Sequence, residues 1–239
     1  MEPIYTCNLC VPPSRCDSTG RLGIPDAFQL FMDAATSHAN LLGVGRADFD
    51  PQQLFWVTVR TKVRFFRRPE MNEEITLSTW PELPERFRCN RQYLLRKGNE
   101  TLAAARTQWA ILNLATGALH PVKDVFPSLP KPSELALSEP FLRMKEPPPC
   151  EPFASYCVRS TDIDIGGHMN NCAYLRAFAA LFSCEDWKAR NYTEFDVHYK
   201  ASCYENDLLL FRETPLEDGS TQFTASLEDE KTILQLACK

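Results

Sequence analysis

The order of hydrophobic and polar positions along the chain predicts the same set of elements twice. Hydrophobic residues recur at helical spacing at about 25–42 and again at about 171–188. Each helix follows a turn that contains an acid and a glycine, and each precedes alternating segments typical of strands. We expect these strands at about 54–68, 73–81, 86–97 and 102–114 in the first half, and at about 191–203, 206–214, 221–228 and 231–238 in the second.

The two halves also match residue by residue. The strands after each helix align without a gap at one offset, which places Asn72 with Asn206 and Glu73 with Asp207. Two copies of one unit are therefore predicted. Each unit has one long helix and a few antiparallel strands, which is typical of an α+β domain whose sheet wraps around its helix.

A proline-rich segment separates the two copies. Eight of the eighteen prolines lie between residues 127 and 152, three of them in a row. Proline has no N–H to donate to a sheet, so this segment is predicted to be an extended linker. The expected organisation is an N-terminal domain at 1–126, a linker at 127–150 and a C-terminal domain at 151–239.

Composition narrows the class of protein. The chain has 239 residues and a net charge of −5, which argues against general nucleic-acid binding. The N-terminus does not resemble a secretion signal, and no apolar run is long enough to span a bilayer, so we expect a cytoplasmic protein. The ten cysteines are scattered and favour reduced thiols. A structural zinc site usually takes two close pairs of ligands, and the sequence has no second cysteine pair beside Cys7 and Cys10, which we interpret as strand residues. No metal is therefore expected. The sequence also shows no glycine-rich phosphate-binding loop, so no cofactor is expected.

One segment combines an acid, a histidine and the start of a helix. Residues 160–175 read STDIDIGGHMNNCAYL, in which Asp164 and His168 flank two glycines before the second helix. Helix N-termini offer unpaired N–H groups and a partial positive charge. A thioester carbonyl could be polarised there while Asp164 acts as general base or nucleophile and His168 orients water or shares the proton. Asp164 could instead be a turn residue, and His168 a structural one.

This segment resembles the active-site segment of hotdog-fold thioesterases. The pattern runs from Asp164 to His168, Asn170 and Asn171, and ends at Tyr174. Together with the doubled arrangement and the tryptophans of the first half, it resembles the acyl-acyl carrier protein thioesterase family of bacteria and plants. The resemblance implies a tandem hotdog in which each sheet wraps its own helix and the two sheets associate. It also implies release of a free fatty acid from acyl carrier protein.

The resemblance assigns roles to individual positions. Asp164 and His168 match the catalytic acid and histidine of the family. Gly166 stands where the family has an asparagine, and Ser202 stands where the plant enzymes have a glutamate, just before Cys203. Gly167, Asn170, Asn171, Ser202 and Cys203 are the expected positioning residues around the substrate. Nothing in the sequence near Cys203 would lower the pKa of its thiol, so we interpret it as a core or pocket residue.

The first half lacks a histidine in its corresponding turn, at 17–23. We therefore expect one working site, with the first unit serving as an acyl-binding scaffold whose apolar helix lines the acyl tunnel. On the strand at 57–65, Arg60, Lys62 and Arg64 alternate with apolar residues. Because acyl carrier proteins are acidic, these three are a candidate docking surface, and a solvated or ion-paired strand face is an equal alternative.

The leading hypothesis is a thioesterase that hydrolyses fatty acyl-acyl carrier protein, with the acyl thioester and acyl carrier protein as its partners. The same site could cleave acyl-coenzyme A. The changes at Gly166 and Ser202 also leave a non-catalytic acyl-binding protein as an alternative. A homodimer is a further candidate assembly.

Overall fold

The computed structural model describes residues 2–130, 135–146 and 150–239. The chain divides into two compact units, Met1–Glu139 and Pro140–Lys239. Parts of the predicted linker, at 131–134 and 147–149, lie outside the described residues. Among the residues described, no helix combines the length and apolarity that a membrane crossing requires.

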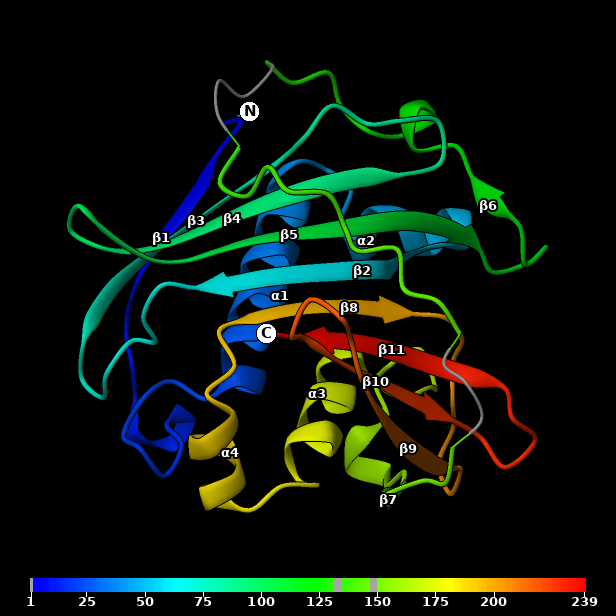
Figure 1. Ribbon diagram of the computed structural model, residues 1–239. Helices are drawn as coiled ribbons and strands as arrows, with labels where there is room; N and C mark the ends of the chain where they lie inside the picture. Colours follow the sequence, from blue (N-terminus) through cyan, green and yellow to red (C-terminus); the bar gives the residue numbers. More distant parts are fainter. Residues whose placement is uncertain (1, 131–134, 147–149) are drawn as a thin grey trace. The chain divides into compact units, whose positions relative to one another are not determined.

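The first unit is an antiparallel sheet with one long helix across its concave face (Figure 1). The strand order is β1-β3-β4-β5-β2, and a short strand β6 pairs with β5. The bounds are β1 Tyr5–Cys10, β2 Leu54–Phe65, β3 Glu74–Pro81, β4 Cys89–Lys97, β5 Glu100–Asn113 and β6 Leu119–His120, with helices α1 Ile24–Leu41 and α2 Arg46–Phe49. The predicted strands of this half are confirmed to within a few residues at each end.

Helix α1 is held by one buried face. Phe28, Phe31 and Ala35 recur at helical spacing, and all three are nearly inaccessible to solvent. Burial of each phenylalanine contributes about 1.5–3 kcal/mol. The helix begins after Gly23 with proline in its first turn, where a missing N–H costs nothing.

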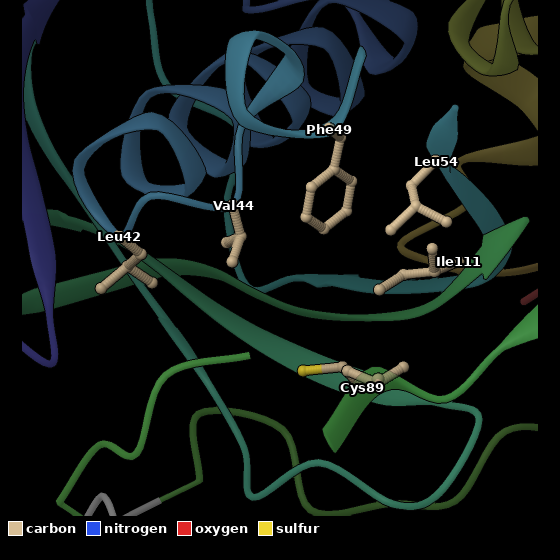
Figure 2. Close-up of a cluster of buried hydrophobic side chains, with 7 residues drawn as sticks. Leu42, Val44, Phe49, Leu54, Cys89 and Ile111 are labelled. Carbon is tan, nitrogen blue, oxygen red and sulfur yellow. The ribbon is translucent and has the colours of Figure 1, made fainter. Parts of the chain in front are cut away.

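A second hydrophobic cluster lies beyond the end of α1. The chain turns there through Gly43, whose positive φ of 69° suits glycine. Trp56 stacks on Phe49 and donates its indole N–H to the Val44 carbonyl at 2.9 Å. Figure 2 shows side chains from α2 and the ends of β2, β4 and β5 converging, and the buried set is Leu42, Val44, Phe49, Leu54, Cys89, Ile111 and Val122. This cluster anchors the α1–β2 connection to the sheet.

His38, on the buried face of α1, is part of a polar network. Its Nδ1 lies 3.0 Å from the Arg91 guanidinium, its Nε2 lies 3.1 Å from the Glu2 carbonyl, and its ring stacks on Tyr5. Because guanidinium only donates, Nδ1 is the acceptor and Nε2 carries the hydrogen. Burial, and then the charge of Arg91, lowers the pKa of His38. The histidine therefore stays neutral and ties the N-terminal strand to the helix.

The second unit repeats this plan (Figure 1). Its antiparallel strand order is β8-β11-β10-β9-β7. The bounds are β7 Ala154–Cys157, β8 Glu194–Tyr199, β9 Leu208–Pro215, β10 Thr221–Ser226 and β11 Thr232–Cys238, with helices α3 Asn171–Ala179 and α4 Cys184–Arg190. Each unit is thus one sheet with a helix packed on it, and the α+β prediction is confirmed.

The prediction of one continuous helix at 171–188 is wrong. Helix α3 ends at Ala179, and α4 begins after Ser183. Ser183 accepts a hydrogen bond from the Asp186 N–H at 3.1 Å, while the Asp186 side chain accepts from the Ser183 N–H at 2.9 Å. This reciprocal capping starts a new helix. Phe182, in the break, and Trp187, on α4, pack on each other with ring centroids 5.6 Å apart.

The predicted repeat is confirmed by matching backbone geometry. Asn72 and Asn206 both have left-handed backbone, with φ values of 64° and 71°. The N–H of Asn72 donates to Val11 at 2.8 Å, and the N–H of Asn206 donates to Val158 at 3.0 Å. An asparagine in this conformation at matching positions indicates one turn built twice.

The described part of the linker lies along the two sheets without joining them as a strand. In the first unit, Leu137 is buried and exchanges two hydrogen bonds with the side chain of Gln92, at 2.9 and 3.2 Å. In the second, the carbonyl of Lys145 accepts from the side chains of Gln222 and Gln235 at 2.9 and 3.1 Å. At these two described positions, backbone polar groups of the linker are satisfied by strand side chains.

Candidate active site

The acid and histidine predicted to act together lie in a tight turn before α3. The N–H of Asp164 donates to the carbonyl of His168 at 3.1 Å, and the N–H of Gly167 donates back to the carbonyl of Asp164 at 2.9 Å. Gly167 has φ of 77°, which a residue with a side chain adopts only with strain. Outside the turn, Ile163 and Met169 form an isolated antiparallel bridge.

The Asp164 carboxylate is held on both of its oxygens. The N–H of Gly166 donates to Oδ1 at 2.8 Å, and Nδ2 of Asn170 approaches Oδ2 at 3.3 Å. Nδ1 of His168 lies 3.9 Å from Oδ1. The two side chains are about a quarter exposed, at 26% and 29%. The structure therefore brings Asp164, His168 and Asn170 together where water and substrate can reach them.

Asn170 connects this turn to the helix. Its Oδ1 accepts the N–H of Cys172 at 2.8 Å, which makes it the N-cap of α3, whereas Asn171 is the first residue of the helix. The N–H of Asn170 donates to the carbonyl of Asp162 at 2.8 Å. One side chain thus caps the helix with its oxygen and contacts the acid with its nitrogen.

The first unit contains the same turn with different side chains. Its backbone hydrogen bonds correspond one for one: Asp17 N to Arg21 O at 2.8 Å, Gly20 N to Asp17 O at 3.0 Å, Leu22 N to Pro69 O at 2.8 Å and Gly23 N to Arg15 O at 2.8 Å. Asp17 therefore matches Asp164, and Arg21 stands where the second unit has His168. The carboxylate of Asp17 also forms an ion pair with Arg68, the residue that matches Ser202. The turn of the first unit therefore has an acid that is ion-paired with an arginine, and it has an arginine in place of the histidine.

A family comparison places this turn among known proteins. The model described as the acyl-ACP thioesterase N-terminal domain matches residues 3–128, and the model described as the acyl-ACP thioesterase C-terminal domain matches residues 148–234. The chain belongs to the acyl-ACP thioesterase family. The turn that carries Asp164 and His168 lies within the C-terminal match, and the turn that carries Asp17 lies within the N-terminal one.

Individual relatives of this family member are distant. It is 23% identical over 214 residues to an oleoyl-acyl carrier protein thioesterase, chloroplastic, of Coriandrum sativum, and 24% identical over 238 residues to oleoyl-acyl carrier protein thioesterase 2, chloroplastic, of Arabidopsis thaliana. These alignments cover 82% and 87% of this chain but 58% and 65% of the relatives. The chain thus spans about three fifths of their length.

Solved structures establish the fold. An acyl-ACP thioesterase from Bacteroides thetaiotaomicron superposes with a TM-score of 0.83 at 23% identity, over 99% of this chain and 97% of that one. The 12:0-ACP thioesterase from Umbellularia californica gives 0.83 at 16% identity, over 100% and 97%. At such identities the likeness concerns the fold. The prediction of a tandem hotdog is confirmed.

Cys203 of this acyl-ACP thioesterase family member is a buried thiol beneath the turn. It is inaccessible to solvent, its Sγ lies 3.2 Å from the Tyr174 hydroxyl, and its carbonyl accepts the N–H of Met169. Burial raises the pKa of its thiol to about 11. The neighbouring Ser202 is exposed, so it lies at the surface next to a packed residue.

We expect Cys203→Ala to retain at least about a third of wild-type turnover, because a thiol with a raised pKa is not a nucleophile at neutral pH. The change removes a buried sulfur, so stability is expected to fall by about 1–2 kcal/mol. Steady-state kinetics and urea unfolding test both parts. An inactive but folded variant, together with inhibition of the wild type by alkylation at Cys203, would establish a cysteine mechanism instead.

Asp162 is a site residue that the sequence analysis missed. It is 5% exposed, and its Oδ2 accepts from the Tyr156 hydroxyl and from the Arg159 N–H, both at 2.9 Å. These bonds fix the short 3₁₀ turn Ser160–Asp162, whose last carbonyl holds Asn170. The signal available in the sequence was a second acid two residues before Asp164.

We expect Asp162→Ala to lower kcat about ten-fold with little change in KM, because the loss acts through the placement of Asn170 and Asp164. Asp162→Asn keeps an oxygen that can accept both hydrogen bonds and should restore most of the activity. Kinetics of the two variants side by side test this. Equal losses in both would show that the charge of Asp162, and not its placement of the turn, matters.

The candidate docking residues of β2 are less exposed to solvent than their alternation with apolar residues predicts. A bulge between Thr58 and Arg60 shifts the register, so the apolar face is continuous only from Thr61 onward. Lys62 is buried, and Arg64 forms a 2.5 Å ion pair with Glu139 of the linker. A role of Arg60, Lys62 and Arg64 in docking stays a prediction.

Proposed function

We propose that this protein hydrolyses the thioester of fatty acyl-acyl carrier protein to give a free fatty acid and the carrier protein thiol. The observation that carries the proposal is the contact between the Asp164 carboxylate and the His168 imidazole at the start of α3, in a chain of the acyl-ACP thioesterase family. An acid beside an imidazole can remove a proton from water and return it to a leaving thiolate.

The remaining roles follow from the hydrogen bonds of the turn. The N–H groups of Gly167, Met169 and Asn170 donate to backbone carbonyls. We therefore assign the polarisation of the thioester carbonyl to the N–H of Asn171, at the positive end of α3. Asn170 positions Asp164. Cys203, in the segment between β8 and β9, supports the turn through its carbonyl, and the exposed Ser202 beside it stays a predicted positioning residue.

We propose that the first unit binds the acyl chain. It contains a pocket of about 370 Å³ between α1 and the strands β1 and β3, lined on its apolar side by Leu9, Leu30, Ala34, Ile75 and Leu77. Pockets for small ligands usually measure roughly 300–1,000 Å³ and have mostly apolar walls with a few polar groups. Here the polar groups include Arg15, Asp33 and Ser37. The organisation that we propose keeps the expected boundaries, with the acyl scaffold at 1–126, the linker at 127–150 and the catalytic domain at 151–239.

The test is turnover of acyl-acyl carrier protein and acyl-coenzyme A thioesters by the purified protein, measured side by side over several chain lengths. Faster hydrolysis of the carrier-protein thioester supports the proposal. Preference for the coenzyme A thioester would make the protein an acyl-CoA thioesterase. Tight binding of the acyl chain without turnover of either would identify a non-catalytic acyl-binding protein.

Docking of the acidic carrier protein on β2 is tested by charge reversal. We expect Arg60→Glu to raise the KM for acyl-acyl carrier protein several-fold, with less effect at high salt, and to leave a small thioester analogue unaffected. Arg64→Glu also breaks the ion pair with Glu139. Glu139→Gln breaks the same pair but keeps the arginine, so it is the matched control. Equal losses on both substrates would indicate that the arginines stabilise the sheet.

We further propose a cytoplasmic location. Cell fractionation tests it. A homodimer is open to test by light scattering of the purified protein.

A further inference from the structure

The pocket of the first unit has apolar walls that come from the sheet and from the helix. On the sheet side, Leu9 of β1 lies opposite Ile75 of β3, and Cys7 lies opposite Leu77. On the helix side, α1 contributes Leu30. Ile75 and Leu77 are nearly inaccessible to solvent, so these walls are part of the core. An alkyl chain suits such walls, because its burial is favourable and needs no polar partner.

One charged side chain of this pocket has hydrogen-bond donors without acceptors. Arg15 ends the short 3₁₀ turn Pro13–Arg15, which follows β1, and its side chain is 35% exposed. Among the described residues, no acceptor lies within hydrogen-bond distance of its guanidinium, and its Nη1 is buried. Its ion-pair partner is Asp33, whose Oδ2 lies 3.9 Å from Nη2. A guanidinium has five N–H donors, and a buried donor without an acceptor costs free energy.

The ion pair of Arg15 is looser than those of other arginines in the first unit. Arg67 and Arg106 donate to carboxylates at 2.9 and 2.7 Å. The carboxylate of Asp33, in contrast, is 53% exposed, and its Oδ1 accepts from the side chain of Gln29 at 2.9 Å. Solvent screens an exposed charge of this kind. The guanidinium of Arg15 is therefore available to a ligand in the pocket.

A positive charge beside an apolar pocket distinguishes the substrate of the proposed reaction from its product. The substrate carries its acyl chain on a neutral thioester. The product is a fatty acid, which is ionised at neutral pH and can accept two parallel hydrogen bonds from a guanidinium. Hydrogen bonds between ionised groups are about twice as strong as those between neutral groups. The combination of apolar walls and Arg15 therefore fits the free acid better than the thioester.

We propose that this pocket is a product site, which binds a free fatty acid with its alkyl chain against Leu9, Leu30 and Ile75 and its carboxylate on Arg15. This inference rests on the proposed thioesterase function and adds its regulation. The released acid occupies the space that the acyl chain of the next substrate needs. The acid therefore inhibits competitively, and the apparent KM rises as it accumulates.

The first test measures binding to the wild-type protein by isothermal titration calorimetry. The probes are dodecanoate and hexadecanoate, each compared with its methyl ester. We expect each acid to bind about ten-fold more tightly than its ester, because only the acid carries a charge. Arg15→Gln should abolish this preference. Asp33→Asn removes a negative charge near Arg15 and should tighten binding of the acid a few-fold, while leaving binding of the ester unchanged.

The second test locates the bound acid and needs neither a variant nor turnover. Cys7 lines the pocket and is partly exposed, so bound dodecanoate should slow its alkylation by iodoacetamide several-fold. Burial raises the pKa of the Cys7 thiol, so the reaction is run at alkaline pH. Cys184 is exposed in α4 of the second unit and is the internal reference. Mass spectrometry measures both rates in one sample, and an unprotected Cys7 would contradict the site.

Kinetics connect the site to turnover. With acyl-acyl carrier protein as the substrate, dodecanoate should inhibit the wild-type enzyme competitively. Arg15→Gln should raise the inhibition constant about ten-fold and raise KM much less, because the thioester has no carboxylate to lose. A parallel rise in both constants would show that Arg15 shapes the pocket without recognising the acid. Circular dichroism and the urea midpoint establish that each variant is folded.

The outcomes separate the product site from the proposed function. Equal affinity for acid and methyl ester, or an inhibition constant that Arg15→Gln leaves unchanged, overturns the product site and leaves the thioesterase proposal intact. Binding of the acid with the expected preference, in a protein that cleaves no acyl thioester, supports the fatty acid site and overturns the proposed function. Opposite shifts in Arg15→Gln and Asp33→Asn, confined to the acid, support the inference.

Discussion

Asp164→Asn and His168→Ala are each expected to lower the turnover of acyl-acyl carrier protein by about 100-fold or more and to leave the protein folded, the scale expected for loss of a general base or its partner. Asparagine keeps one oxygen for the N–H of Gly166, which Asp164 now accepts at 2.8 Å, but it cannot take a proton from water. Alanine at 168 removes the group that passes the proton on.

Folding should survive both changes, because the backbone of the turn is held by bonds that neither variant removes. The carbonyls of Asp164 and His168 accept from Gly167 and Asp164 respectively. The first unit offers the matched control: Asp17→Asn alters the corresponding acid, which is already paired with Arg68, and should leave kcat unchanged. Wild-type activity in folded Asp164→Asn or His168→Ala would remove that residue from the mechanism.

The largest expected effect on stability comes from Glu73→Gln in the first unit. The Glu73 side chain is 6% exposed, and it accepts two hydrogen bonds from Arg67, at 2.9 and 3.0 Å, and a third from the N–H of Glu70 at 2.8 Å. Lys97 lies 2.7 Å from the same carboxylate. Glutamine would turn an N–H₂ toward these donors and lose the charge. We expect a loss of about 2–3 kcal/mol in the free energy of unfolding.

The dependence of this loss on pH is a second, sharper check. The hydrogen bonds from Arg67, and secondarily that from Lys97, lower the pKa of Glu73 to about 2, against 4.5 for a free glutamate. A carboxyl group with a lowered pKa stabilises the folded state above the unfolded pKa, and this contribution is lost as the pH falls toward the folded pKa. The difference between wild type and Glu73→Gln should therefore be full at neutral pH and shrink between about pH 4.5 and 2.

Urea unfolding of the two proteins across this range measures the effect. Glu100→Gln is the control, since Glu100 also pairs with Arg67 but is half exposed, and exposed ion pairs contribute little to stability. A Glu73→Gln loss no larger than that of Glu100→Gln would show that the charge network contributes little to folding.

The sequence by itself determined those features that depend on neighbouring residues. The strands β2 to β5 and the helix α1 follow from the spacing of apolar side chains, because each element must bury one face. The Asp164–His168 turn was recognisable because its two residues and its glycines lie within five positions. The break between α3 and α4 was also readable, since Ser183 and Asp186 have the spacing of a reciprocal cap. The helical spacing of apolar residues through Leu181 obscured it.

Only the tertiary structure decided features that join distant residues. The bulge in β2 and the pairing of Arg64 with Glu139, 75 positions away, depend on which segments lie side by side. The equivalence of Arg68 in the first unit and Ser202 in the second also depends on the folded arrangement, because each lies near the turn before a helix that is distant in sequence. Contacts of this kind have no local pattern, because the side chains that make them are selected by packing and not by their sequence neighbours.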